Sequence, residues 1–291
     1  LADPRSPIIN RDGLGVWLQQ VAWGTSKSVG NTSSYDLTGW GATGGIEYRL
    51  GGLGSIGLTA AYLSGKDGRD NNELISTEYE GGVYWRGGFG PVHAFARATA
   101  GRVKFDGTRN FTTTLDGVPV TRATDGEWKG TLYSAVAGVS YEARMGKFSL
   151  RPSATFEHFK LREKGYQEEG GGTAFDLTVG KRSSSETAVL GLLTLGYNLL
   201  GTDPVGSAAW MRVELEGGWR QILSGSLGDT TARFTGGDPF TLSADERDSG
   251  WRGGLRLLGG GSGMSVIGEV NAEQQQGKVG FGARLGVQFA L

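Results

Sequence analysis

The sequence predicts an all-β fold, a transmembrane antiparallel β-barrel of about twelve strands with a polar lumen. Three observations lead to this prediction. Long segments alternate between apolar residues and polar or small ones, glycine is frequent inside those segments, and the links between them are alternately short and long. Short periplasmic turns on one rim and longer extracellular loops on the other are typical of outer-membrane barrels.

The last segment of the chain, residues 277–291, alternates most strictly. Val279, Phe281, Leu285 and Phe289 share one face, and the residues between them are charged, polar or very small. A period of two indicates a β-strand with one apolar face. Because roughly 9–11 residues of tilted strand cross a bilayer, this segment is long enough to span a membrane.

The same alternation predicts the earlier strands over residues 15–25, 37–50, 54–64, 76–86, 91–105, 128–143, 148–162, 185–199, 209–223, 249–258 and 264–274. Short links are expected near 51–53, 87–90, 144–147, 201–207 and 259–263. Longer and more polar links, expected to be extracellular loops, fall near 26–35, 65–75, 106–126, 163–184 and 224–248. Residues 1–12 are predicted to be a linker, and residues 13–291 to be the barrel domain.

Composition restricts the possible functions. The chain has 291 residues, 53 glycines, no cysteine and a net charge of −1. Nothing in this charge favours a nucleic-acid partner, and a chain without cysteine forms no disulfide and has no thiol nucleophile. The acidic residues Asp238, Asp245, Glu246 and Asp248 lack the spacing of a calcium-binding loop, so no metal site and no cofactor is expected.

Some charged residues occupy the same alternate positions of a strand as the small polar residues, on the face opposite the apolar one. They are expected to line the lumen, because an arginine facing lipid at the bilayer midplane costs roughly 2–4 kcal/mol. These residues are Glu47, Arg49, Glu78, Glu80, Arg86, Arg97, Glu142, Arg212, Glu214, Glu216, Arg220, Arg252, Arg256 and Glu269. Both signs occur on neighbouring strands, which favours pairing across the strands. The same residues would give a hydrated path for a peptide inside the barrel.

A soluble antiparallel barrel or sandwich would also show alternation. Such a protein buries its apolar face and exposes charge to water. Here the face opposite the apolar one is rich in glycine, serine and threonine, with a few charges of both signs. That composition favours a narrow polar lumen and hence the membrane barrel.

Six short segments, in this order along the chain, are similar to segments of a known protein family. They are residues 15–19 (GVWLQ), 35–45 (YDLTGWGATGG), 57–64 (GLTAAYLS), 233–240 (RFTGGDPF), 251–257 (WRGGLRL) and 284–291 (RLGVQFAL). With these segments, residues 13–291 resemble the translocator, or β-domain, of the classical autotransporters of type V secretion. The resemblance implies a bacterial outer-membrane location and transport rather than catalysis. An N-terminal passenger would cross the membrane with the barrel and be displayed or released outside.

The resemblance also implies partners. They are the chain's own passenger, which this sequence does not contain, the lipid of the outer membrane, and the barrel assembly machinery, with the barrel itself a monomer. The start Leu1-Ala2-Asp3-Pro4 lacks the pattern of a secretory signal, so the sequence is interpreted as the C-terminal part of a longer protein. Family members carry a helix inside the lumen, and residues 1–12 are expected to be its remnant.

The final octet resembles the β-signal that the barrel assembly machinery recognises. By this resemblance its elements are Arg284, Gly286, Phe289 and Leu291. Family members usually end on phenylalanine or tryptophan, whereas this chain ends on leucine.

Two alternatives remain open at this point, a free-standing porin and a barrel hydrolase. The only histidines, His93 and His158, are not in a His-x-Ser motif, and no spacing indicates a positioned base and nucleophile. Histidines within strands, in the lumen or in an aromatic girdle, are the simpler interpretation. We therefore expect no enzymatic activity, and we expect no self-cleavage at Asn10.

Overall fold

A computed structural model describes residues 13–27, 35–69, 72–115, 117–201, 209–244, 248–261, 264–275 and 278–290. The predicted linker 1–12 and Leu291 lie outside the described residues. No helix in the described part of the chain is long and apolar enough to cross a membrane.

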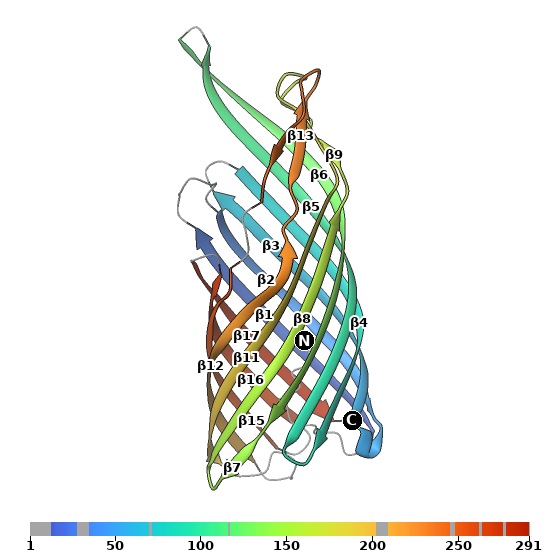
Figure 1. Cartoon of the computed structure of the whole chain (residues 1–291), viewed down its shortest axis with the longest axis vertical. Coiled ribbons are helices and arrows are strands. Elements are labelled where there is room, and N and C mark those ends of the chain that lie inside the picture. Colours follow the sequence, from blue (N-terminus) through green and yellow to red (C-terminus); the bar gives the residue numbers. More distant parts are fainter. Residues whose placement is uncertain are drawn as a thin grey trace.

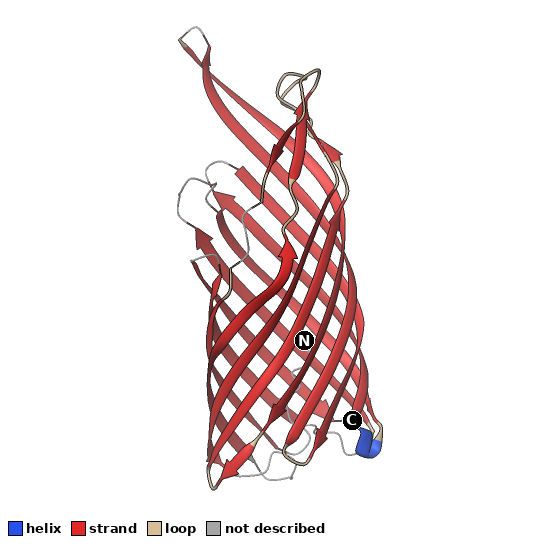
Figure 2. Ribbon diagram, viewed as in Figure 1, coloured by secondary structure: helices blue, strands red, loops and turns tan. Residues whose placement is uncertain are grey.

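Twelve long antiparallel strands form one closed, tilted barrel, which confirms the predicted fold class (Figures 1 and 2). The strands are β1 (Leu14–Lys27), β2 (Tyr35–Arg49), β3 (Ser55–Arg69), β4 (Asn72–Phe89), β5 (Val92–Leu115), β6 (Val118–Tyr141), β8 (Phe148–Glu163), β11 (Arg182–Leu200), β12 (Trp210–Ser226), β15 (Gly250–Gly261), β16 (Met264–Gln275) and β17 (Lys278–Ala290). The short strand β7 (Ala143–Met145) follows β6 and pairs with β8.

Each barrel strand pairs with the next barrel strand in the chain, and one further pairing, between the last strand and the first, closes the ring. The last strand, β17, pairs with β1 from Gly15 opposite Ala290 to Thr25 opposite Gly280. Strand β8 pairs with β11 along its whole length. Because the sheet closes on itself, the barrel portion of the long strands leaves no unpaired edge.

The short connections gather at one end of the barrel, and the chain enters β1 from that end. The predicted link at 51–53 is a tight turn, the 3-10 helix η1 (Gly51–Leu53). Gly51 and Gly54 have φ of 59° and 89°, values that favour glycine because a side chain is strained there. Leu14, the first residue of β1, lies opposite Tyr48, just before this turn. Short turns mark the periplasmic rim, so β1 starts at the periplasmic side.

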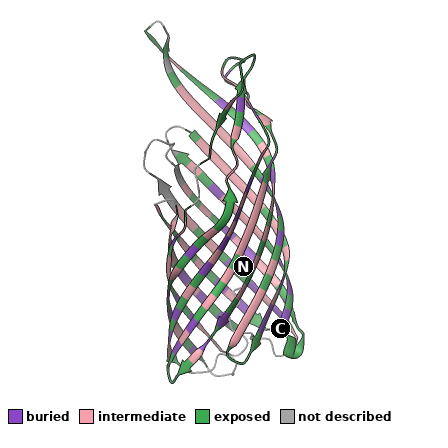
Figure 3. Cartoon of the chain, viewed as in Figure 1, coloured by how far each residue is buried: buried purple, intermediate pink, exposed green. Residues whose placement is uncertain are grey.

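The outer wall is apolar and carries aromatic residues at two levels. Three strands have an exposed aromatic pair eight residues apart: Trp40 and Tyr48, Tyr133 and Tyr141, and Phe281 and Phe289. Eight residues along a strand tilted by about 40° rise roughly 21 Å. This is close to the apolar band of about 25 Å that aromatic girdles bound in outer-membrane barrels. The outward alternation is visible as alternating colours along the strands in Figure 3.

Glycines on the inner wall make room for aromatic rings from a neighbouring strand. A Cβ atom on Gly57 would lie 2.3 Å from Cζ of Tyr84 and 2.6 Å from the carbonyl oxygen of Ile46. A Cβ atom on Gly45 would similarly meet the Trp17 ring at 2.7 Å. Only glycine permits this close approach, which accounts for part of the high glycine content inside the strands.

Part of the loop prediction was wrong. Residues 65–75 and 106–126 are mostly strand, because β3 and β4, and β5 and β6, continue far beyond the expected ends as paired ribbons. In the second ribbon Thr108 Oγ1 donates a hydrogen bond to Asp125 Oδ1 at 2.7 Å. Above the membrane both faces of a ribbon contact water, so the strands need no apolar face and the alternation that would reveal them is lost.

The predicted loops 163–184 and 224–248 also contain strands. Four of them, β9 (Tyr166–Gln167), β10 (Leu177–Val179), β13 (Thr230–Phe234) and β14 (Phe240–Leu242), form a small second sheet beyond the barrel. Arg109 of β5 joins this sheet, donating to Glu168 and to the Phe175 carbonyl oxygen, the latter at 2.9 Å. The Tyr166 ring stacks on Trp128 at 4.3 Å. Burial first, and then the Glu168 carboxylate, raises the pKa of the Tyr166 phenol.

Candidate functional site: the charged lumen

The lumen contains a connected group of ion pairs, which we name the Glu214 cluster: Arg151, Arg212, Glu214, Arg256 and Glu269. Glu214 lies at its centre and is only 1% exposed. Its Oε2 accepts from Nη2 of Arg151 and from Nη1 of Arg256, each at 2.7 Å, and its Oε1 lies 3.0 Å from Nε of Arg212. Nε of Arg256 lies 3.0 Å from Oε2 of Glu269.

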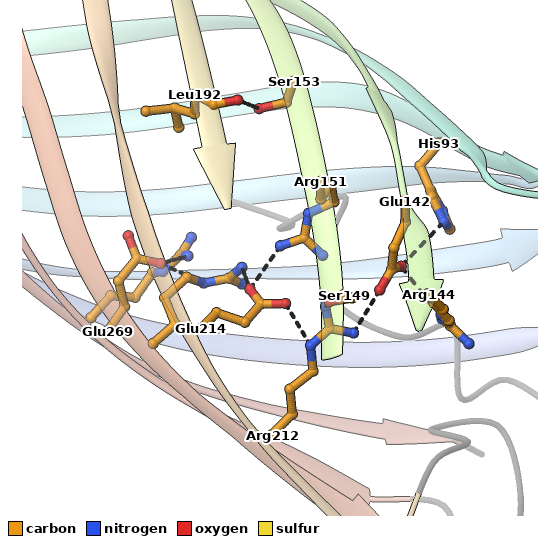
Figure 4. Close-up of polar contacts among 12 residues, drawn as sticks. His93, Glu142, Arg144, Ser149, Arg151, Ser153, Leu192, Arg212, Glu214 and Glu269 are labelled. Atoms are coloured by element: carbon orange, nitrogen blue, oxygen red, sulfur yellow. Dashed lines mark hydrogen bonds and ion pairs between the residues drawn. The ribbon is translucent and has the colours of Figure 1, made fainter. Parts of the chain in front are cut away.

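The Glu214 cluster continues in both directions around the wall (Figure 4). Arg212 also donates to Oε1 of Glu142 at 2.7 Å, and Glu142 lies 3.9 Å from Nε2 of His93 on β5. At the other end Glu269 pairs with Arg284 of the last strand. The interactions therefore extend from β5 to β17.

A second group surrounds Arg220, which contacts three carboxylates. Its guanidinium pairs with Glu186 at 2.5 Å, with Glu157 at 3.2 Å and with Glu273 at 3.8 Å. Arg252 adds a second cation, 3.6 Å from Glu273. The charges of this group are close to balanced, so a solute inside the barrel meets cations and anions together.

A third group lies next to the seam where β17 meets β1. Glu47 accepts hydrogen bonds from Nε of Arg86 at 2.9 Å and from the Tyr84 hydroxyl at 3.1 Å. The same hydroxyl accepts from Nε1 of Trp17 at 2.8 Å. Nε2 of Gln288, on the last strand, donates to Glu47 at 3.4 Å. One carboxylate thus links β1, β2, β4 and β17.

These contacts need the inner curvature of the barrel. Arg151 and Glu214 come from β8 and β12, which β11 separates, and Glu47 and Arg86 come from β2 and β4, which β3 separates. Residues that are two strands apart meet only where their side chains converge inside the ring. Buried charges are costly unless they are paired, and each of these is paired.

Between the three groups the lumen contains a cavity of about 380 Å³. Its wall includes Arg86, Arg97, Arg220, Arg252 and Glu157. Nη1 of Arg97 is buried there without a hydrogen-bond partner in the described part of the chain. The cavity wall therefore combines apolar side chains with guanidinium groups, and one of these guanidinium nitrogens has no partner within the described residues.

The structure places the residues predicted to line the lumen as follows. Eight are buried: Glu47, Arg86, Glu142, Glu214, Glu216, Arg220, Arg256 and Glu269. Five are half-buried, namely Glu78, Glu80, Arg97, Arg212 and Arg252, and Arg49 is exposed at the end of β2. The three groups bring nine of these residues together, and Arg97 lines the cavity between the groups.

The sequence analysis missed Arg151, Glu157, Glu186 and Glu273, which are central to the ion pairs. Arg151 shares its parity with Ser149 and Ser153, so the alternation of its strand contained the necessary signal. Glu186 is only 1% exposed and lies two residues before the apolar run 188–193, so the polar parity of this strand was not recognised.

The two histidines lie on opposite faces of the wall. His93 faces the lumen beside Glu142, whereas Nδ1 of His158 lies 2.9 Å from the Thr187 hydroxyl on the outer wall. Neither hydrogen-bonds to a serine, as far as the described residues show. Within that same part of the chain no three histidine or carboxylate side chains gather in a way that could hold a metal ion.

The residues of the expected assembly signal lie along β17. Arg284 faces the lumen, Gly286 is buried, and Phe289 is 44% exposed on the outer wall. A Cβ atom on Gly286 would lie 2.8 Å from Cγ2 of Ile267 and 2.9 Å from Cγ of Gln19. Leu291, the fourth expected element, is outside the described residues.

Comparison with known proteins places these features in a family context. Residues 16–266 match the family model described as the autotransporter beta-domain. No curated protein matches the sequence.

Among solved structures, the translocator domain of the autotransporter NalP from Neisseria meningitidis is 18% identical, with a TM-score of 0.71 over 97% of this chain and 90% of that chain. The β domain of the Bordetella autotransporter BrkA is 14% identical, with a TM-score of 0.58 over 96% of this chain and 100% of that one. The transport unit of AIDA-I from Escherichia coli is 15% identical, with a TM-score of 0.58 over 98% and 93%. At these identities the likeness concerns the fold.

Proposed function

This chain belongs to the autotransporter β-domain family and forms an outer-membrane translocator barrel, and from that premise we propose that its charged lumen is the path along which an N-terminal passenger leaves the cell. Autotransporter translocator domains are non-enzymatic barrels, and we assign no catalytic role to His93 or His158. The family does not favour the porin alternative.

One observation carries the proposal, the position at which the chain enters the barrel. Leu14 opens β1 at the rim of the short turns, opposite Tyr48. A passenger joined upstream of β1 therefore begins at the periplasmic side. To reach the cell surface it must cross the membrane, and the barrel interior is the polar route past the apolar band.

The lumen is suited to an extended peptide because most of its charges are paired within the wall. Glu214 and Glu47 each bind arginine within the wall, so neither needs a partner from the passenger. A passing segment meets carboxylates and guanidinium groups in alternation, and its backbone can hydrogen-bond to them in turn. We further propose that residues 1–12 form the linker between passenger and barrel.

A cross-linking experiment tests this path. Because the chain contains no cysteine, a single cysteine can be introduced without competition. Thr155 lines the lumen cavity and is half-buried, whereas its neighbour Phe156 is 45% exposed on the outer wall. With a passenger fused upstream and stalled during export, Thr155→Cys is expected to cross-link to a passenger cysteine through a short bismaleimide, and Phe156→Cys is expected not to.

Ser134→Cys and Tyr133→Cys repeat the comparison on β6, since Ser134 lines the same cavity and Tyr133 is exposed on the outer wall. Equal cross-linking at the paired positions, or cross-linking only at Phe156 and Tyr133, would mean that the passenger does not pass through the interior.

We also propose that Arg284, Gly286, Phe289 and Leu291 are read by the barrel assembly machinery, with the folded barrel a monomer. Phe289 is 44% exposed and Phe281, on the same face of β17, is 65% exposed. Replacing either exposed ring with alanine removes little packing. If recognition depends on position, Phe289→Ala lowers the amount of folded barrel in cells several-fold, and Phe281→Ala does not.

Heat-modifiability gels of membrane fractions measure this difference. Both variants are expected to refold equally well from urea into detergent micelles, where no assembly machinery is present. An equal loss in cells for the two variants would remove the assigned role of Phe289.

A further inference from the structure

A group of basic residues lies on the outer wall above the upper aromatic level. We name it the cationic patch: Arg102, Lys104, Lys129, Lys160, Arg162 and Lys164. These residues come from β5, β6 and the end of β8, three strands that lie side by side (Figure 1). Arg102 and Arg162 both lie opposite Thr131 of β6, on its two sides.

The remaining cations continue the same arrangement. Lys104 lies directly opposite Lys129, and the Lys164 backbone N–H donates to the Lys129 carbonyl oxygen at 2.9 Å. Lys160 lies opposite Tyr133, whose ring is exposed on the outer wall. All six side chains therefore project outward, on one rigid piece of sheet.

The charge of the cationic patch is not balanced within the described part of the protein. Lys104 pairs with Asp106 at 2.9 Å and with Glu127 at 3.3 Å. The other five cations make no ion pair with any described acid. Like charges directly opposite each other destabilise a sheet, and the two carboxylates beside Lys104 leave the opposite Lys129 and the four other cations without a counter-charge among the described residues. The arrangement therefore indicates an external anion.

A hollow in the wall coincides with the patch. It has a volume of about 470 Å³, and its lining includes Tyr79, Arg102, Lys104, Lys129 and Lys164. This volume lies in the range of small-molecule sites. Four cations and an aromatic ring around one hollow suit a compact ligand with several anionic oxygens.

The level of the patch identifies the kind of ligand. On β6, Thr131 is ten residues from Tyr141 of the lower aromatic level, a rise of roughly 26 Å along a tilted strand. The apolar band is about 25 Å tall, so Arg102 and Arg162 lie at its upper edge. This edge is on the side of the long extensions, which is the extracellular leaflet. Below it the wall presents Ala98, Ala100 and Ala135.

We propose that the cationic patch binds the phosphate groups of a phosphorylated glycolipid in the outer leaflet, whose acyl chains lie against the alanine-rich wall below. Arginine forks bind phosphate oxygens in pairs, and the lysines add point charges around them. The bound lipid neutralises the five cations that have no acidic partner and fixes the height of this side of the barrel in the membrane.

The test uses the folded barrel in nanodiscs of phosphatidylcholine that contain a trace of lipid A or the same lipid after enzymatic dephosphorylation. The patch variant combines Arg102→Gln, Lys129→Gln, Arg162→Gln and Lys164→Gln. The control variant removes four exposed cations elsewhere by Lys66→Gln, Arg122→Gln, Lys147→Gln and Lys181→Gln. All these side chains are exposed, so both variants are expected to fold, which heat-modifiability gels verify.

Native mass spectrometry then measures the lipid that each barrel retains. The wild type and the control variant are expected to retain lipid A at least about tenfold better than the patch variant, since each basic residue near the surface adds attraction to an anionic lipid. The dephosphorylated lipid is expected to bind all three barrels equally weakly. Equal retention of lipid A by the wild type and the patch variant would overturn the proposal, as would equal retention of the two lipids by the wild type.

Inorganic phosphate distinguishes a lipid site from a site for free anions. At millimolar concentration it is expected to leave bound lipid A in place, because it lacks the acyl chains that hold the lipid against the wall. Complete displacement by inorganic phosphate would overturn the assignment to a lipid headgroup.

Discussion

Replacing Glu214 with alanine is expected to destabilise the barrel by about 3 kcal/mol, because removal of one partner leaves buried charges without compensation. Glu214 is 1% exposed and contacts Arg151, Arg212 and Arg256. Without Glu214, these three guanidinium groups lose their shared carboxylate and repel one another inside the lumen. Glu214→Gln keeps the acceptor oxygen but removes the charge, so its effect should be intermediate.

The free energy of unfolding is measured from urea titrations of the refolded barrel in detergent micelles, followed by tryptophan fluorescence. The control is Glu73→Ala, which breaks an exposed ion pair of similar length, 2.8 Å to Lys66. Exposed pairs contribute little, so this variant should shift unfolding by no more than about 0.5 kcal/mol. Similar shifts for Glu214→Ala and Glu73→Ala would show that the Glu214 cluster does not stabilise the lumen.

Two adjacent glycines of β12 are expected to differ sharply when each is replaced by alanine. A Cβ atom on Gly218 would lie 1.9 Å from the carbonyl oxygen of Gly191 and 2.9 Å from Cα of Leu192, on the paired strand. Backbone atoms cannot rotate away, so Gly218→Ala should cost about 2–3 kcal/mol or prevent closure of the sheet. A Cβ atom on Gly217 would meet nothing within 4 Å.

Gly217→Ala is therefore the matched control, and it should be neutral or slightly stabilising because alanine reduces the entropy of the unfolded chain. The same urea titration measures both variants, and heat-modifiability gels show whether each barrel closes. Equal effects of the two substitutions would contradict the close approach of β11 and β12 at this point.

Alternation alone was sufficient to predict the barrel and the inward parity of many charged residues. On β12, Arg212, Glu214 and Arg220 occupy even positions, whereas the exposed residues Leu215 and Trp219 occupy odd ones. This alternation predicted that the three charges face away from lipid, and the structure buries or half-buries all three. The two-residue period is a local property of a strand. The period can therefore be read from the sequence of one strand without knowledge of the rest of the fold.

The partners of these charges could not be predicted in the same way. Arg151 meets Glu214 across an intervening strand, and this depends on the register of two pairings and on the curvature of the ring. Neither quantity is encoded in a short stretch of sequence. The cationic patch was missed for a related reason, because its members meet only through the register in which β5, β6 and β8 pair.

The extended ribbons and the small second sheet were missed because they lie in water. Residues 106–126 form a ribbon through backbone pairing and contacts such as that between the Thr112 and Thr121 hydroxyls at 3.3 Å. Both faces of the ribbon are polar, so the sequence resembles that of a loop. The sequence predicted only that His158 lies in a strand. The structure places it opposite Ala135 of β6, and this register shows that it lies on the outward face.

The central claim is that a passenger joined upstream of β1 reaches the cell surface through this barrel. Protease accessibility on intact Gram-negative cells tests it most directly, with a signal peptide, an epitope and a helix-length linker placed before Leu1. The account predicts that external protease removes the epitope while heat-modifiability gels show a folded barrel. An epitope that stays protected although the barrel is folded would contradict the account.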